Sequence, residues 1–239
     1  MLALTAAIGL AMSDPLDAQV PFEGEVRQLV TFRFQPGRSA EAVELYRAQA
    51  LPLYERDSAM RSFRAFREVE SPVPLDLVVV SSFDGMGGMD ASNAELRGLA
   101  AEAGTSIGAI YGGIGGLSEG HHDQFIEMLP ELGDGDPASS RLVAFIWYRV
   151  LPGEASSFER TLRRILAPLE RESGTPSSTG RFLVADGWDY LRIVGFDSLA
   201  AYQEYWRTIA GADGLAYLEG ITSRRREVLL APMPELAVR

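Results

Sequence analysis

The 239-residue sequence has no cysteine, and counting its basic residues shows that all 22 are arginine. Without cysteine there are no disulfides, no thiol nucleophile, no iron–sulfur ligands and no cysteine-based zinc site. Without lysine there is no Schiff-base chemistry and no phosphate-loop lysine. Histidine occurs only as the adjacent pair His121 and His122, which makes neither a histidine-rich metal cage nor an HExxH helix. We therefore expect no metal and no organic cofactor, which leaves carboxylate, arginine, hydroxyl and aromatic chemistry.

Positive charge is also scarce, since 33 acidic residues give a formal net charge of −11. Nucleic acids and anionic membranes attract basic surfaces, so the charge argues against both as main partners. The sequence also lacks an apolar run of the roughly 20 residues that a membrane-spanning helix needs. We expect no nucleic-acid partner and no integral membrane segment.

The N-terminus is the one markedly apolar stretch. Residues 2–12 are almost wholly apolar and are followed by the small and polar residues SDPLDAQ. That order is typical of a secretory signal, although no basic residue precedes the apolar run. We therefore predict a signal peptide at 1–19 and a secreted or periplasmic protein, with a cytoplasmic protein as the alternative.

The chain contains an internal repeat. The segment LVTF at 29–32 resembles LVAF at 142–145, and a Pro-Gly pair follows each, at 36–37 and at 152–153. A predicted amphipathic helix comes next in both halves, with Pro52 and Pro168 at equivalent places 116 residues apart. Proline inside a helix costs about 3 kcal/mol, so the same costly choice in both helices indicates duplication.

Each half reads as β-α-β-β-α-β. The first half has expected strands at 26–34, 61–69, 75–83 and 121–129, and expected helices near 38–57 and 89–103. The second half has expected strands at 141–150, 180–185, 188–196 and 224–231, and expected helices at 154–172 and 198–210. This divides the chain into unit 1 at 24–132, a linker at 133–140, unit 2 at 141–232 and a C-terminal tail at 233–239.

The element order is the split β-α-β pattern of ferredoxin-like domains. One such unit leaves a sheet face uncovered, and two units can bury these faces against each other. Two tandem units, each with Pro-Gly after its first strand, resemble the dimeric α/β-barrel superfamily, which includes antibiotic-biosynthesis-monooxygenase-like and NIPSNAP-like proteins. The resemblance implies an α+β fold in which two ferredoxin-like units form a pseudo-dimeric barrel, with further oligomerisation left open. No catalytic signature accompanies it, so no site residues carry over.

Strand alternation predicts which side chains enter the barrel between the sheets. In 188–196 we place Leu191 and Ile193 toward the helices, and in the first strand of unit 2 we place Ala144 and Ile146 inward. The predicted ligand-binding residues are Arg33, Tyr148, Trp188, Tyr190 and Arg192. They would seat an aromatic anion, with arginine pairing its carboxylate or phenolate. Alternatively, the arginines pair with Asp76 or Asp189 and the aromatic rings only fill the core.

The histidine pair opens the last strand of unit 1. Neighbouring strand residues face opposite sides, so the two cannot share a ligand or a metal ion. One would face the barrel as a general base tuned by Asp123 or Glu119. The predicted catalytic residues are His121, His122, Tyr148 and Tyr190. Alternatively, the pair lies at an edge and has no catalytic part.

Two further motifs allow several interpretations. Glycine recurs every fourth residue from Gly104 to Gly120, which favours a loop or lid over the barrel mouth, with a closely packed helix as the alternative. The spacing is not that of a dinucleotide fingerprint. The triplet Arg224–Arg226 opens the last strand and could bind a phosphate, although a solvated or salt-bridged edge fits an acidic protein better.

The function that these features favour is binding of a small apolar or aromatic molecule inside the barrel, without a metal. One alternative is a cofactor-independent oxygenase, cyclase or isomerase that acts on a small aromatic substrate, with Arg33 or Arg192 as electrostatic stabiliser. A second is a structural or interaction module whose barrel is filled. An open cavity of about 300 Å³ or more would separate the ligand hypotheses from the structural one.

Overall fold

The computed structural model describes residues 24–70, 76–133, 135–184, 187–211 and 213–238. The signal peptide predicted at 1–19 lies outside them. The first half contains β1 (Glu25–Phe34), β2 (Met60–Glu70), β3 (Leu77–Asp84) and β4 (Ser118–Met128), with α1 (Ser39–Leu45), α2 (Leu51–Tyr54), α3 (Gly85–Glu102) and α4 (Ile107–Gly115). The second contains β5 (Leu142–Val150), β6 (Ser177–Val184), β7 (Tyr190–Phe196) and β8 (Thr222–Val238), with α5 (Ala155–Thr161), α6 (Ala167–Ser173), α7 (Leu199–Ala210) and α8 (Asp213–Gly220).

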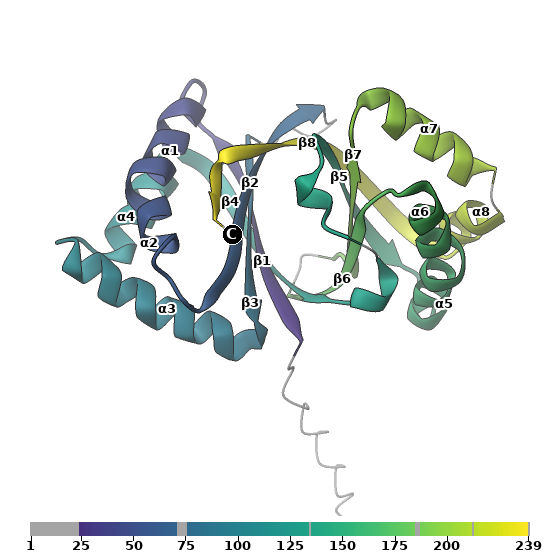
Figure 1. Ribbon diagram of the computed structural model, residues 1–239, viewed down its shortest axis with the longest axis horizontal. Helices are drawn as coiled ribbons and strands as arrows, with labels where there is room; N and C mark the ends of the chain where they lie inside the picture. The colour runs from purple at the N-terminus through teal and green to yellow at the C-terminus, as the bar shows by residue number, and fades with distance from the viewer. Residues whose placement is uncertain (1–23, 71–75, 134, 185–186, 212, 239) are drawn as a thin grey trace, which may run out of the picture.

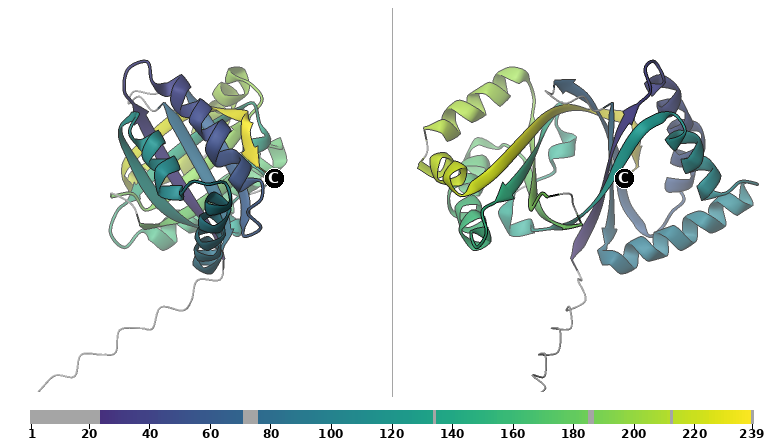
Figure 2. Two further views of the ribbon diagram at one scale, coloured as in Figure 1. Left: turned by 90° about the vertical axis from the view of Figure 1, so that its left-hand side faces the viewer. Right: turned by 180° about the vertical axis from the view of Figure 1, so that it is seen from behind.

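The strands form one closed barrel in the order β1-β3-β2-β8-β5-β7-β6-β4. Every neighbouring pair is antiparallel. Within the first half the order is β4-β1-β3-β2, and within the second it is the equivalent β8-β5-β7-β6. The helices α1–α4 lie outside one half of the barrel and α5–α8 outside the other (Figures 1 and 2). The predicted α+β class is therefore confirmed, with an eight-stranded barrel at its centre.

Both proline-containing helices contain the same irregularity. A π-helical turn, Tyr46–Ala50, separates α1 from α2, and another, Leu162–Leu166, separates α5 from α6. The residue just after each turn, Leu51 or Ala167, donates its N–H to a carbonyl five positions back, and Pro52 or Pro168 comes next. Because proline has no N–H to donate, a wider turn just before it lets the helix continue.

The protein has three apolar cores. One lies between the first-half strands and α1–α4, and the second lies between the second-half strands and their helices. The third fills the barrel itself, with Leu29, Phe66, Phe145 and Trp147 among its buried members. The space between the sheets, where sequence reasoning placed the ligand, is therefore occupied through its middle by packed side chains. Packing fills only the middle of the barrel, since hollows open at its two ends.

The faces of β5 are the reverse of those predicted. Val143, Phe145 and Trp147 point into the barrel, whereas Ile146 and Tyr148 point toward the helices. The letters LVTF and LVAF align at an offset of 113, but the Pro-Gly pairs and the helices keep an offset of 116. The two offsets differ by three residues. Because side chains alternate along a strand, a shift by an odd number of residues moves every side chain to the other face.

The faces of β7 are reversed as well. Leu191 and Ile193 lie in the barrel core, while Tyr190 and Arg192 lie on the helix side. Every residue of β7 is buried, so neither face of the strand meets water. Polarity along the strand therefore does not identify which face lies toward the barrel.

Two segments differ from their predicted form. The glycine-rich stretch forms the helix α4, which the Ser106 hydroxyl caps by accepting from the Ala109 N–H at 3.1 Å. Its Ile110 and Ile114 are buried in the first core, so a helix with one apolar face replaces the expected loop. At the C-terminus, β8 continues to Val238 and pairs with β2, where a tail was expected.

No helix in the described ranges combines the length and the hydrophobicity that a membrane span requires.

Candidate active site

A pocket of about 200 Å³ opens between the first-half strands and their helices. Its walls come from β1, β2, β3 and β4 on one side and from α3, α4 and the helix around the first π turn on the other. Aromatic and aliphatic side chains form most of the lining, among them Phe32, Phe63, Phe83, Met60, Leu96 and Ile114. The pocket therefore lies behind the sheet, outside the barrel.

Three tyrosines gather on the helix side of this pocket. Tyr46 comes from the first π turn, Tyr54 from α2 and Tyr111 from α4. The Tyr54 and Tyr111 hydroxyl oxygens lie 2.8 Å apart, in hydrogen-bond contact. Burial raises the pKa of all three phenols above the ordinary value, and for Tyr46 the nearby Tyr111 and Asp123 raise it further. The tyrosines are therefore neutral hydrogen-bond donors at physiological pH.

A histidine–aspartate pair lies on the strand side. His121 Nε2 is 3.3 Å from Asp123 Oδ2, and the two residues share a face because they are two apart on β4. The Gln28 amide donates to Asp123 Oδ1 at 2.9 Å, and the His121 ring stacks on Phe32 at 5.7 Å between centroids. These contacts orient the imidazole. The His121 side chain remains 50% exposed, at the edge of the pocket.

A buried carboxylate supports the wall beside α3. Asp57 is fully buried and accepts hydrogen bonds from the Ser92 hydroxyl and from the Ala59 and Met60 N–H groups, the latter two at 2.9 and 3.2 Å. Because these bonds occupy Asp57, it acts as a structural group that fixes α3, while Ser92 also lines the pocket.

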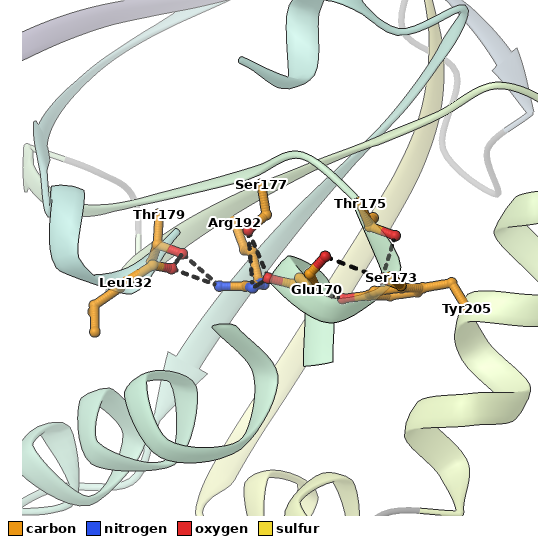
Figure 3. A network of polar contacts seen from close by, with 8 residues as sticks. All are labelled: Leu132, Glu170, Ser173, Thr175, Ser177, Thr179, Arg192 and Tyr205. Carbon is orange, nitrogen blue, oxygen red and sulfur yellow. Dashed lines mark hydrogen bonds and ion pairs between the residues drawn. The ribbon is translucent and has the colours of Figure 1, made fainter. Parts of the chain in front are cut away.

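The equivalent space in the second half is filled. Arg192 on β7 and Glu170 on α6 form an ion pair with side chains 1% and 0% exposed (Figure 3). Arg192 also donates to Thr179 Oγ1 at 2.7 Å and to the Leu132 carbonyl at 3.0 Å. The guanidinium and the carboxylate thus pair inside the second core, where only Arg192 Nε is without a hydrogen-bond partner among the described atoms of the pair.

Glu170 takes two further donors in the same network. The Ser177 and Tyr205 hydroxyls each donate to its carboxylate at 2.6 Å (Figure 3). Burial opposes the charge of Arg192, but the adjacent carboxylate outweighs it and raises the pKa of Arg192 above the ordinary value. This cluster is structural, as the alternative of paired arginines anticipated, although its partner is Glu170. Asp76 and Asp189 instead accept from the N–H groups of Phe34 and Val150 at 2.6 and 2.7 Å.

The two predicted tyrosines of unit 2 belong to the same solid core. Tyr148 and Tyr190 are 4% and 1% exposed, and both rings contact Phe158. The Tyr190 hydroxyl donates to Glu159 Oε1 at 2.8 Å. Neither side chain approaches the tyrosine pocket, which the other half of the molecule forms.

The remaining predicted residues lie apart from one another. Arg33 lies near the end of β1, where its side chain is 61% exposed and pairs with Glu119 at 3.0 Å. Trp188 packs at the edge of the barrel core. His122 is opposite Thr31 in the register and so faces the other side of β4 from His121. His121 alone of the predicted set lines the pocket.

Sequence reasoning missed the three tyrosines that characterise the pocket. Tyr46 was visible as part of a weak apolar stripe at the position equivalent to Leu162, where a phenol replaces an aliphatic side chain. Tyr111 was hidden among glycines whose helix was not predicted. Tyr54 follows Pro52 on a helix and no pattern singled it out, whereas Asp123 was one of the two carboxylates predicted to tune the histidine.

Metal ligation has no obvious place in the described part of the chain, which contains no group of three or more histidine, aspartate or glutamate side chains able to hold an ion.

Comparison with known proteins gives structural matches only. No protein-family model matches the chain, and no curated protein matches its sequence. A candidate monooxygenase from Lactobacillus acidophilus NCFM matches with a TM-score of 0.62 at 11% identity, over 88% of this chain and 94% of its own. An anthrone oxidase-like protein matches with a TM-score of 0.62 at 10% identity, over 90% and 93% of the two chains. Chlorite dismutase from Candidatus Nitrospira defluvii, in complex with imidazole, matches with a TM-score of 0.58 at 12% identity, over 89% and 92%.

At these identities the likeness concerns the fold, and it extends over nearly the full length of the chains compared. The eight-stranded closed barrel with helices outside each half is the architecture that the sequence pattern predicted. The chain therefore shares its fold with these proteins.

Proposed function

We propose that the protein binds a small aromatic molecule in the tyrosine pocket and that His121 removes a proton from it. The observation that carries this proposal is the arrangement of the pocket, with neutral phenols on one wall and an aspartate-held imidazole on the other. An enzyme needs such a pair of a positioned base and hydrogen-bond donors to stabilise an aromatic substrate as its anion.

The size and polarity of the pocket support a compact aromatic ligand. Its volume of about 200 Å³ is below the roughly 300 Å³ named above for an open ligand cavity but exceeds the roughly 150 Å³ of a dry apolar cavity that holds benzene. Phe32 and Phe63 offer faces for stacking, and the hydroxyls of Tyr46 and Tyr111 can donate to an oxygen on the ring. A ligand with one to three rings and a hydroxyl or keto group matches these features.

The reaction that fits best is oxygenation without a cofactor. An aromatic methylene compound such as an anthrone loses a proton to His121, and the resulting carbanion transfers electrons to molecular oxygen. One oxygen atom is then retained as the new carbonyl and the other leaves as water. Two of the structural neighbours, named as a candidate monooxygenase and an anthrone oxidase-like protein, support this choice over a cyclase or an isomerase.

We further propose that the two halves are tandem ferredoxin-like units produced by duplication. Their equivalent strand orders, their π turns before Pro52 and Pro168, and the matched contacts of Asp76 and Asp189 support this. The units then diverged, since one keeps a pocket behind its sheet and the other holds the Arg192–Glu170 pair there.

The chain supplies its own matched control for the test. His121 and His122 are adjacent and carry the same side chain, but only His121 lines the pocket. Binding of 2-naphthol is measured by calorimetry, and oxygen uptake with anthrone is measured against an enzyme-free blank. We expect H121A to retain 2-naphthol binding and to lose oxygen uptake by at least about 100-fold, the usual range for a general base. H122A should match the wild-type protein.

Three results would contradict the proposal. Absence of saturable 2-naphthol binding to the wild-type protein would contradict the proposal that the pocket binds a small aromatic molecule. Equal oxygen uptake by H121A and wild type would remove the role of His121 as the base, and no oxygen uptake by wild type would leave a protein that binds without turnover.

A further inference from the structure

A second and larger hollow lies in the other half of the molecule. It is an open groove of about 780 Å³ at the end of the barrel where β5 ends and β8 begins. Arg149 on β5, Arg181 on β6 and Arg224 on β8 line it, together with the apolar side chains of Leu151 and Phe182. The tyrosine pocket shares none of these residues.

Two of these arginines face each other directly. Arg149 and Arg224 are register partners across the β5–β8 pair, and they share the face that Trp147 and Arg226 present to the barrel. Like charges directly opposite on neighbouring strands destabilise a sheet. Among the described residues, no carboxylate forms an ion pair with either guanidinium; that of Arg224 lies over the Trp188 ring, 4.7 Å from its centroid.

The acidic groups near the groove are already engaged. Asp189 accepts the Val150 N–H at 2.7 Å through one oxygen, and Glu127 pairs with Arg181 at 2.6 Å. Next along β8, Arg226 stacks on Trp147, and within the described structure its Nε and Nη2 atoms are buried without a hydrogen-bond partner. The guanidinium groups of Arg149 and Arg224 therefore face each other without an ion-pair partner in the described structure, whereas Arg226 lies near the Glu68 carboxylate.

Arginines at the opposite end of the barrel differ from Arg149 and Arg224 in having partners. A cavity of about 310 Å³ there is also lined by arginines. Arg27 pairs with Glu25 at 2.7 Å, Arg61 pairs with Asp84 at 2.9 Å, and Arg64 donates to the Val238 carbonyl at 2.8 Å. At that end each of these arginines has a carboxylate or carbonyl partner, whereas Arg149 and Arg224 have no ion-pair partner among the described residues.

We propose that the groove is a binding site for a small organic anion, whose phosphate or carboxylate group bridges Arg149 and Arg224. Each guanidinium can donate two parallel hydrogen bonds to such a group. The anion relieves the repulsion between the two arginines, and the apolar part of the ligand packs along Leu151 and Phe182. Phosphate and carboxylate share this chemistry, so the experiment compares the two.

The test uses phenyl phosphate and benzoate as probes in titration calorimetry with the full chain. We expect saturable binding of at least one probe, weakening as salt is added. R149Q and R224Q should each weaken it about tenfold or more, because each removes a charge-assisted contact. R207Q is the matched control, since it removes the same charge from an exposed ion pair on α7 and should leave binding unchanged.

The outcome is separable from that of the tyrosine pocket. H121A should bind the probe like wild type, whether or not His121 proves to be a base. A stronger response to phenyl phosphate would identify the ligand class as phosphorylated, and a stronger response to benzoate would identify it as a carboxylate. No saturable binding of either probe, or equal binding by R149Q, R224Q and R207Q, would overturn the proposal.

Discussion

Replacing Glu170 by glutamine removes the negative charge of the buried network and keeps the shape of the side chain. The carboxylate accepts from Arg192, Ser177 and Tyr205, and nothing else in the network carries a negative charge. After the change, the Arg192 cation remains in a core where its side chain is only 1% exposed. An amide cannot compensate that charge, so the folded state loses far more than one ordinary hydrogen bond.

The expected loss follows from the burial of both partners. Breaking a buried pair by removing one partner costs about 3–5 kcal/mol, because the remaining charge stays desolvated. Typical stabilities are about 5–15 kcal/mol, so the change removes a large fraction of the total. The matched control is E204Q, whose ion pair with Arg207 has side chains 65% and 69% exposed. A surface pair contributes about 0–1 kcal/mol.

Urea unfolding of wild type, E170Q and E204Q measures both losses from the same chemical change. We expect a midpoint far below wild type for E170Q and close to wild type for E204Q. The double variant E170Q/R192M also removes the buried positive charge of Arg192 and should recover part of the lost free energy of unfolding. If E170Q and E204Q cost the same within about 0.5 kcal/mol, the assignment of the pair as a structural charge cluster is wrong.

Two other predictions concern packing and pH. At Gly180 a methyl group would lie 2.3 Å from Ile126 Cγ2, so G180A should destabilise the protein by about 1–3 kcal/mol, measured by urea unfolding. Burial raises the pKa of Tyr46 and Tyr54 above the ordinary 10.0. The unfolded chain therefore loses these protons first, and stability should be unaffected below about pH 10 and should fall as pH rises beyond it, measured by urea midpoints across that range.

Each of these has its own control. At Gly98, on α3, a methyl group meets nothing within 4 Å, so G98A should stabilise the protein by about 0.5–1 kcal/mol. Equal effects of G98A and G180A would contradict the packing argument. The double variant Y46F/Y54F should reduce the alkaline decline, and an unchanged decline would show that other groups cause it.

The sequence was sufficient for the architecture because the signals there are strong and repeated. The Pro-Gly turns and the two prolines set the period of the sequence repeat, and the element bounds mostly agree within about three residues. The helix α4 was missed because glycine has low helix propensity, and tertiary packing of Ile110 and Ile114 outweighed it.

The candidate site was harder because polarity alone does not identify the face of a strand buried on both sides. In β7 the polar Arg192 was assigned to the barrel, yet its partner Glu170 comes from a helix on the other side. That pairing depends on two residues brought together by the fold, and neither strand alternation nor composition reveals it. His121 was a candidate because the sequence contains only two histidines, but it lines the pocket behind the sheet and not the barrel, where a base was predicted.

The course of β8 has a consequence for how the chain is made. This strand pairs with β5 along its first part and with β2 near its end, where Val238 lies opposite Phe63. The hydrogen bonds between β2 and β8 can therefore form only after the residues near Val238 have left the ribosome, long after β2 itself has been synthesised. Until then β2 has a free edge, a state in which strands pair with other chains. The later part of β8 thus determines when this edge of β2 is covered in a nascent chain.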